Sequence, residues 1–406
     1  MNTALKHWKE AATVILAAGM KHKRAVEALW RDTSGSRSAL LQQHVHVPPK
    51  SAFDYEVLLL KRSSKSGFMP SAYVFPGGIV EPVDFSAEWL ELFKAFRHLP
   101  NFGVSVVKQP IESRPPMFAA DRVQFGSPIP GDIAFRICAV RETFEESGVL
   151  LVVPTDEAEH AKSRNQSDHQ LTALSDRWDR SSISKWRSLV LQNSSNFIQM
   201  CKELECLPNI WALHEWGNWL TPDGVNSKQR RYDTAFYMCC LKEIPTTLQD
   251  QKEIVHFKWS SPSEILHSYQ NREFWIAPPQ FYDLGRMCNF PLLSDLHDFA
   301  KRRSTEGCEQ WLPVILPATD GSITVLPGDS QYTNTIPDAG KTSSTAAPKK
   351  RLEQLQEDTE GSNMHRIAFQ NLYNASVYVN IIPKYKHLAP LTSSDPNGLS
   401  KHNSKL

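Results

Sequence analysis

The sequence predicts an α/β protein, because strand-like apolar segments and amphipathic helices follow one another along a chain of ordinary globular composition. Hydrophobic residues make up 41% and charged residues 22% of the 406 positions, which excludes fibrous architecture and disorder along the whole length. This length suits one elaborated domain or two to three plain ones. With 45 Lys and Arg against 44 Asp and Glu, we expect no DNA partner. Since no run approaches 18 apolar residues, we expect no membrane span either.

Apolar or β-branched runs bounded by charge, glycine or proline predict the strands. These runs lie at residues 11–19, 55–62, 72–75, 149–153, 211–219, 232–241, 254–259 and 321–327, with a hard turn at 76–78. Apolar residues at helical spacing predict helices. These lie at residues 86–96, 133–147, 168–177, 183–204, 263–270 and 281–301. The firmest of them is 133–147, because Gly148 ends it sharply.

The domain organisation follows from shifts in composition. One large domain is expected over residues 8–328, with insertions at about 85–131 and 155–208. Residues 329–362 are rich in Gly, Ser, Thr, Pro and charge, which is typical of a flexible linker. The C-terminal extension 363–406 contains two further β-like runs that could dock back on the core.

The seven cysteines are scattered, odd in number and without a CxxC pair. Disulfides and structural zinc are therefore poorly supported, and we expect a reducing intracellular compartment. The sequence also lacks GxxxxGK[ST], GxSxG and HExxH, which argues against P-loop, serine hydrolase and zincin chemistry.

The chemically informative segment is the acidic face of the helix at 133–147. Glu142 and Glu146 are about 40° apart around the helix, and Glu142 and Glu145 about 60°, so the three carboxylates share one face. Such neighbours repel and raise each other's pKa unless a cation neutralises them, and a hard divalent cation with oxygen ligands can do so. The alternative is an exposed acidic helix face without a ligand.

The run R-E-T-F-E-E-S-G-V at 141–149, preceded by P-G-G at 76–78, resembles the signature of the Nudix hydrolases, G-x5-E-x7-R-E-U-x-E-E-x-G-U. Asp84 stands near the position of the first Glu, and Thr143 stands where an aliphatic residue is usual. Between Asp84 and Arg141 lie 56 residues where the signature has seven, so 49 are inserted. An interrupted signature of this kind resembles the coenzyme A diphosphatase branch of the family. Arg141 is expected to pair with a carboxylate and orient the helix.

The resemblance implies an α/β/α sandwich with a mixed central sheet, and metal-dependent hydrolysis of the diphosphate linkage of coenzyme A and acyl-CoA. It implies Mg²⁺ or Mn²⁺ bound by Glu142, Glu145, Glu146 and the backbone of Gly78, with Glu253 as a further ligand or base. Arg230 and Arg231, with Lys228, form a cluster that either holds substrate phosphates or is an ordinary charged strand edge. Hydrolysis of NADH, ADP-ribose or an RNA cap remains an alternative, as does a non-catalytic Nudix-fold module that binds CoA or a nucleotide.

The tripeptide Ser404-Lys405-Leu406 is the peroxisomal address read by an import receptor. We therefore expect this receptor as a partner and the peroxisome as the location, the alternative being a coincidental tripeptide.

Overall fold

The computed structural model describes residues 8–20, 47–163, 171–222, 231–250, 252–333, 350–357 and 361–391. Within these ranges every helix is too short or too polar to cross a bilayer. The cysteines are all free and buried.

A mixed eight-stranded sheet forms the centre of the molecule. Its main path runs β10-β7-β8-β1-β2-β3, while β4 pairs with β1 and β9 with β2. The strands are β1 Lys9–Gly19, β2 Tyr55–Arg62, β3 Tyr73–Val74, β4 Gly77–Ile79, β7 His214–Leu220, β8 Tyr232–Leu241, β9 Ile254–Ser260 and β10 Gln310–Trp311. The strand β1 is parallel to β8 and antiparallel to β2 and β4, so the sheet is mixed as predicted.

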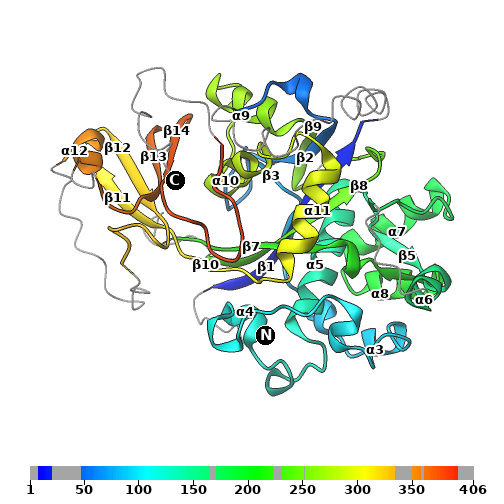
Figure 1. Cartoon of the computed structure of the whole chain (residues 1–406). Helices are drawn as coiled ribbons and strands as arrows, with labels where there is room; N and C mark the ends of the chain where they lie inside the picture. The colour runs from blue at the N-terminus through cyan, green and yellow to red at the C-terminus, as the bar shows by residue number, and fades with distance from the viewer. Residues whose placement is uncertain are drawn as a thin grey trace, which may run out of the picture.

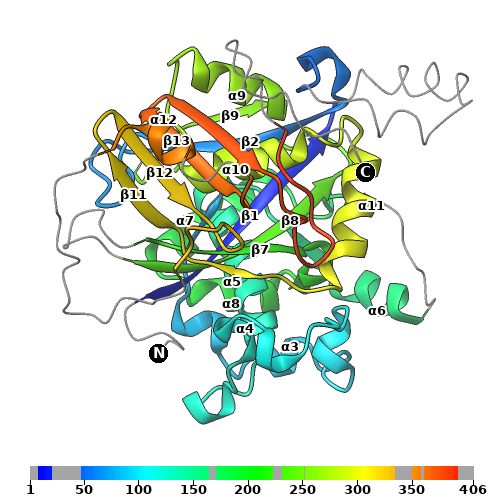
Figure 2. The ribbon, with the colours of Figure 1, turned by 60° about the vertical axis from the view of Figure 1, so that its left-hand side comes forward.

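Helices cover both faces of this sheet, which gives the expected α/β/α sandwich (Figure 1). In Figure 2, α5, α8, α4 and α3 lie on one side and α9 and α10 on the other. The helices are α3 Trp89–Leu92, α4 Pro116–Ala119, α5 Gly131–Ser147, α6 Thr155–Ser163, α7 Arg180–Gln192, α8 Asn196–Glu203, α9 Pro262–Gln270, α10 Pro278–Met287, α11 Leu293–Ser304 and α12 Leu352–Glu357. Along β1, alternate residues enter the two cores: Val14 and Leu16 pack toward α5, and Ile15 and Ala17 pack toward α10.

The C-terminal segment forms a second, four-stranded antiparallel sheet in the order β11-β12-β13-β14. Its strands are β11 Val314–Ala318, β12 Gly321–Val325, β13 His365–Asn371 and β14 Asn374–Val379. The two β-like runs of the extension are therefore strands, and they pair with strands from before residue 328 rather than forming a separate unit. His365 links this sheet to the helical layer, since its Nε2 lies 2.8 Å from the Tyr282 hydroxyl.

Four predicted helices differ from the structure. The helix predicted at 183–204 is divided into α7 and α8, and the helix predicted at 281–301 is divided into α10 and α11. Residues 171–177 are not helical, because Thr172 lies beside the end of β8 and exchanges backbone hydrogen bonds with Cys240 and Lys242. The helix predicted at 86–96 is reduced to α3, because the rings of Phe93 and Phe96 turn into the core against Trp211. Tertiary packing overrides helical periodicity in the last two cases.

The segment predicted as a linker is partly structured. Asp329 is buried and its carboxylate binds the Arg366 guanidinium at 2.6 Å. Helix α12 places Leu352 in a small core with Ile323. Residues 334–349 lie outside the described residues. Shorter strands β5 Val152–Pro154 and β6 Cys206–Pro208 form a third, two-stranded sheet.

Candidate active site

A buried ion pair joins the two separated halves of the signature. The Arg141 guanidinium donates from Nε and Nη2 to the two carboxylate oxygens of Asp84, both at 2.9 Å. Arg141 is 1% exposed and Asp84 is fully buried. Burial by itself lowers the pKa of Arg141, yet Asp84 and Glu142 raise it well above the usual value. Asp84, at the position where the signature has glutamate, therefore contacts Arg141 directly despite the 49 inserted residues.

Arg141 also orients the acidic face of α5. Its Nη1 donates to Glu142 at 2.9 Å and to Glu145 at 2.8 Å, and its Nη2 donates to the Ile79 carbonyl at 3.1 Å. The guanidinium thus ties the helix to β4 and fixes two carboxylates in one direction. The expectation that Arg141 pairs with carboxylates and orients the helix is confirmed.

The predicted helix 133–147 matches α5 closely. Gly148 ends it with φ of +71°, a conformation that favours glycine, and its N–H donates to the Phe144 carbonyl. Thr143, the unusual residue of the signature, is fully buried, and its hydroxyl donates to the Ala139 carbonyl at 2.7 Å. The hydroxyl is thus satisfied within the helix, so Thr143 is tolerated.

The glycines of P-G-G lie directly against the acidic face. They belong to β4 rather than to a simple hard turn, and the Gly77 N–H donates to Glu146 at 2.9 Å. A Cβ added at Gly78 would lie 2.4 Å from the Glu142 carboxyl group. The Gly78 carbonyl faces Cys138 of the same helix, at 3.9 Å from its sulfur. The absence of a side chain at Gly78 therefore allows the backbone and the carboxylate to approach each other.

The carboxylates of α5 carry negative charge that their surroundings do not fully compensate. Burial, together with Glu145 and Asp84, raises the pKa of Glu142 to about 8 although Arg141 opposes the shift. Burial and the nearby Glu142 and Glu253 raise the pKa of Glu146, and burial also raises that of Glu145. A cation in addition to Arg141 would lower these pKa values and favour the ionised carboxylates.

The donor set suits a hard divalent cation. Each of Glu142, Glu145 and Glu146 uses one oxygen for Arg141 or for the Gly77 N–H, and among the described residues the second oxygen of each accepts no hydrogen bond. Carboxylate and carbonyl oxygens are the ligands that Mg²⁺ and similar ions prefer. In the described part of the chain, no three His, Cys, Asp or Glu side chains already converge at metal-binding distances.

Glu253 directly precedes β9 and lies beside the C-terminal end of β2, where its carbonyl accepts a hydrogen bond from the Ser63 N–H. Its carboxylate accepts a bond of 2.8 Å from Arg62, while its own backbone N–H donates to Asp250. With 58% of its side chain exposed it is open to solvent, and its charge contributes to the raised pKa of Glu146. The structure thus brings Glu253 near the α5 carboxylates; its role as ligand or base stays a prediction.

The remaining predicted site residues are not brought to the acidic face by described contacts. The Arg231 guanidinium lies over the Trp8 ring, 5.1 Å from its centroid. Arg230, Lys228 and the tripeptide Ser404-Lys405-Leu406 lie outside the described residues.

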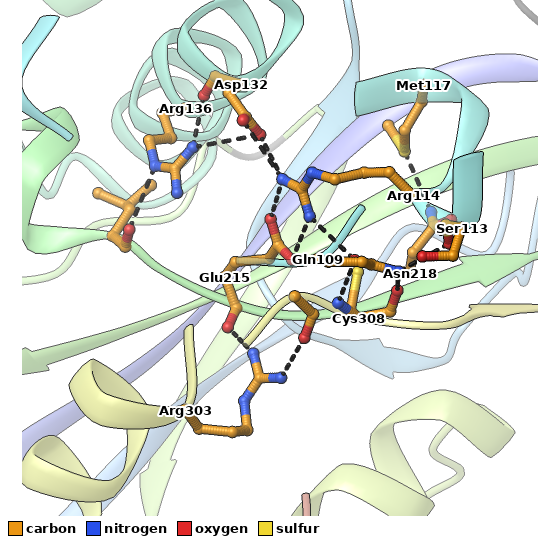
Figure 3. Close-up of polar contacts among 12 residues, drawn as sticks. Gln109, Ser113, Arg114, Met117, Asp132, Arg136, Glu215, Asn218, Arg303 and Cys308 are labelled. Atoms are coloured by element: carbon orange, nitrogen blue, oxygen red, sulfur yellow. Dashed lines mark hydrogen bonds and ion pairs between the residues drawn. The ribbon is translucent and has the colours of Figure 1, made fainter. Parts of the chain in front are cut away.

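A buried polar network fixes the other end of α5 (Figure 3). Arg114 from the first insertion donates to Glu215 of β7 at 2.7 Å and to Asp132, in the first turn of α5, at 3.0 Å. Arg303 of α11 bonds the Glu215 carbonyl. Burial alone would raise the pKa of Glu215, but Arg114, Arg136 and Arg303 together lower it. The first insertion therefore anchors the helix that carries the carboxylates.

Sequence reasoning missed Arg187 of α7, in the second insertion. Its Nε and Nη2 donate to the Glu145 carbonyl at 3.1 and 2.8 Å, so it holds the C-terminal end of α5. Arg62 was missed as the partner of Glu253. Neither arginine is marked by local spacing, because each contact crosses between distant segments.

The fold is an α/β/α sandwich in which Arg141 orients the helix α5, and α5 presents three carboxylates to the glycines of β4. This arrangement is typical of a Nudix hydrolase site. Comparison with known sequences agrees: the family described as NUDT19 Nudix domain matches residues 8–287, and the family described as NUDT19 C-terminal domain matches residues 315–380. The chain belongs to the Nudix hydrolases, in the NUDT19 branch. Nudix hydrolases generally use divalent metal ions.

Two relatives and one solved structure illustrate the similarity. The acyl-coenzyme A diphosphatase NUDT19 of Xenopus laevis is 47% identical, covering 97% of this chain and 98% of its own. The protein of the same name from Homo sapiens is 38% identical, covering 95% of each chain. A Nudix hydrolase crystal structure from Alicyclobacillus acidocaldarius superposes with a TM-score of 0.45 at 17% identity, over 72% of this chain and 96% of that one.

Proposed function

We propose that this protein hydrolyses the diphosphate linkage of coenzyme A and acyl-CoA, giving 3′,5′-ADP and 4′-phosphopantetheine or its acyl form. The observation that carries the proposal is the Arg141-locked acidic face of α5 in a chain that resembles acyl-coenzyme A diphosphatases over nearly its full length. NADH, ADP-ribose and capped RNA are the competing substrates, and a non-catalytic binding module is the competing class.

Glu142, Glu145, Glu146 and the Gly78 carbonyl would hold Mg²⁺ or Mn²⁺. Such an ion supplies charge neutralisation for the diphosphate oxygens and lowers the pKa of a bound water. Arg141 keeps Glu142 and Glu145 pointed in one direction, so the ligands need little reorganisation. This preorganisation by Arg141 is the contribution that the protein fold makes to catalysis.

The remaining roles follow from position and charge. Glu253 is exposed and close enough to Glu146 to affect its pKa, which supports a role as additional ligand or general base. Arg230 and Arg231 are proposed to bind substrate phosphates, because the planar guanidinium group of arginine is permanently charged and can bind phosphate with two hydrogen bonds.

The test is turnover of a substrate panel by the full-length protein in Mg²⁺ or Mn²⁺, with Glu146→Gln as the matched variant. CoA and acyl-CoA should be cleaved, and the variant should lose at least about 100-fold in kcat because a metal ligand loses its charge. Preference for NADH, ADP-ribose or capped RNA would overturn the CoA assignment. Absence of metal-dependent turnover of every compound would favour the binding module.

We also propose that Ser404-Lys405-Leu406 directs the protein to peroxisomes through the import receptor. Acyl-CoA esters are the thioesters on which fatty-acid oxidation works, so the location suits the substrate. Deleting Leu406 from a tagged protein should release it to the cytosol, and persistence of a punctate pattern would refute the proposal.

A further inference from the structure

Arg62, the last residue of β2, is the centre of a hydrogen-bond cluster. Its Nε donates to the Ser66 hydroxyl and to the Phe68 carbonyl, both at 3.1 Å. Its Nη2 donates to the same hydroxyl and to the Glu253 carboxylate, both at 2.8 Å. The Arg62 side chain is 14% exposed, against 58% for Glu253. A largely buried guanidinium therefore joins the segment after β2 to an exposed carboxylate.

Arg62 lies on the face of the sheet that α5 covers. Alternate residues of a strand point to the same face, so Arg62 shares the face of Leu60. Leu60 belongs to the core under α5, as does Ile254, which pairs with Arg62 across β9. Burial is the main cause of the raised pKa of Glu146; Glu253 raises it further and Arg62 lowers it. Both charges therefore act on a carboxylate of the candidate active site.

Glu253 is held at its backbone as well as at its carboxylate. Its N–H donates to the Asp250 carboxylate at 3.0 Å, and its carbonyl accepts the Ser63 N–H at 2.8 Å. Among the described residues, the carboxylate oxygen that does not bind Arg62 accepts no hydrogen bond. Because an ion pair with an exposed partner contributes little to stability, this triple restraint is better explained by where it puts the free oxygen.

A β-bulge lies beside the cluster. The pairing of β2 with β9 shifts between Lys61 and Arg62, and Val255 has no partner in the described register. A bulge bends its strand and redirects neighbouring side chains, and bulges are common next to active sites. Val255 comes two residues after Glu253, so the irregularity falls where β9 receives this carboxylate.

We infer that Arg62 is a positioning residue, which fixes the Glu253 carboxylate beside Glu146 so that its free oxygen binds the same divalent cation. This inference rests on the metal site of the proposed function and adds the group that holds the additional ligand in place. The guanidinium suits this task, because its planar fork bonds two segments at once and keeps its charge.

The competing explanation is that Arg62 is only a cation near the site. A positive charge beside a metal site repels the metal ion, so its removal alone would strengthen metal binding. If Arg62 positions Glu253, its removal instead weakens metal binding, because the additional ligand is no longer held near Glu146. The two explanations therefore predict changes of opposite sign.

The test measures Mn²⁺ binding to the full-length protein without substrate, from the electron paramagnetic resonance signal of free Mn²⁺. Glu253→Gln should weaken binding about tenfold and Arg62→Gln about fivefold, since metal ligands and the residues that orient them both affect affinity. In the Glu253→Gln background, Arg62→Gln should cause no further loss, because the carboxylate through which it acts is already neutral. Ser66→Ala removes two hydrogen bonds of the guanidinium and no charge. It should weaken binding about twofold, and it serves as the test if Arg62→Gln does not fold.

Arg177→Gln is the matched control, since this arginine pairs with Asp156 and Glu157 in the second insertion and should leave Mn²⁺ affinity unchanged. Unchanged affinity in Glu253→Gln, or unchanged or tighter binding in Arg62→Gln, would overturn the inference. An equal loss from Arg62→Gln in both backgrounds would do so as well. The readout needs no turnover. A protein that shows the expected dependence but fails to cleave CoA would refute the proposed function and leave the role of Arg62 standing.

Discussion

Replacing Asp84 by Asn tests whether the interrupted signature is rebuilt through space. Asp84 is fully buried and receives two hydrogen bonds of 2.9 Å from Arg141 and one of 2.8 Å from the Glu81 N–H. The substitution removes the charge and leaves one donor facing the guanidinium. Breaking a buried ion pair costs about 3–5 kcal/mol, and we expect the lower end because Arg141 keeps Glu142 and Glu145.

At about 2 °C per kcal/mol for a chain of this size, the midpoint of thermal unfolding should fall by about 6 °C. The kcat/KM for CoA should fall about 100-fold, because Arg141 no longer fixes the carboxylates that it orients. Differential scanning fluorimetry measures the first effect, and chromatographic detection of 3′,5′-ADP measures the second.

Asp320→Asn is the matched control. Asp320 also pairs with an arginine, Arg351, at 3.3 Å, but both side chains are exposed, so the loss of stability should be much smaller than for Asp84→Asn. If Asp84→Asn shifts the unfolding midpoint no more than Asp320→Asn does, the claim that Asp84 locks the catalytic helix is refuted.

Three further predictions concern the site and its supports. Gly78→Ala should lower kcat about 100-fold with little change in the unfolding midpoint, because the new Cβ displaces the Glu142 carboxylate rather than backbone; unchanged turnover would contradict this. Arg187→Gln should cost about 1–2 kcal/mol in urea unfolding through loss of both hydrogen bonds to the Glu145 carbonyl, and a change below about 0.5 kcal/mol would dismiss that role. Burial lowers the pKa of His365 to about 4, so between pH 6.5 and 4 the unfolded chain binds the additional proton and stability declines as pH falls, by up to about 3 kcal/mol. His365→Gln should flatten this part of the pH profile of the unfolding midpoint, and an unaltered profile would show that other groups cause it.

The sequence was sufficient for the elements whose signals are local. The acidic face of α5 follows from i, i+3 and i+4 spacing, and its end follows from Gly148. The central strands follow from apolar runs, and β2 and β8 match their predicted bounds. The strands β13 and β14 were also predicted. However, β11 and β12, which complete their sheet, come before residue 328, where the large domain was expected to end.

Contacts between distant segments could not be read from spacing. The Asp84–Arg141 pair joins residues 57 positions apart, and Arg187 reaches a carbonyl 42 positions away. Residues 171–177 had helix-like composition, yet the chain gains more from backbone pairing with the end of β8. Asp329 lies in a segment with the composition of a linker. Its buried ion pair with Arg366 produces no periodic pattern in the sequence, so the contact could not be predicted.

The separation of Asp84 from Arg141 has a consequence for how the protein acquires activity during folding. In an uninterrupted signature the helix and its carboxylate partner are close in sequence and can meet early. Here the chain must close a loop of 57 positions, containing the first insertion, before the pair can form. Arg114 of that insertion must also reach Glu215, far later in the chain. The catalytic helix is therefore expected to form before the site it serves, and activity should appear in refolding only after the insertion has docked.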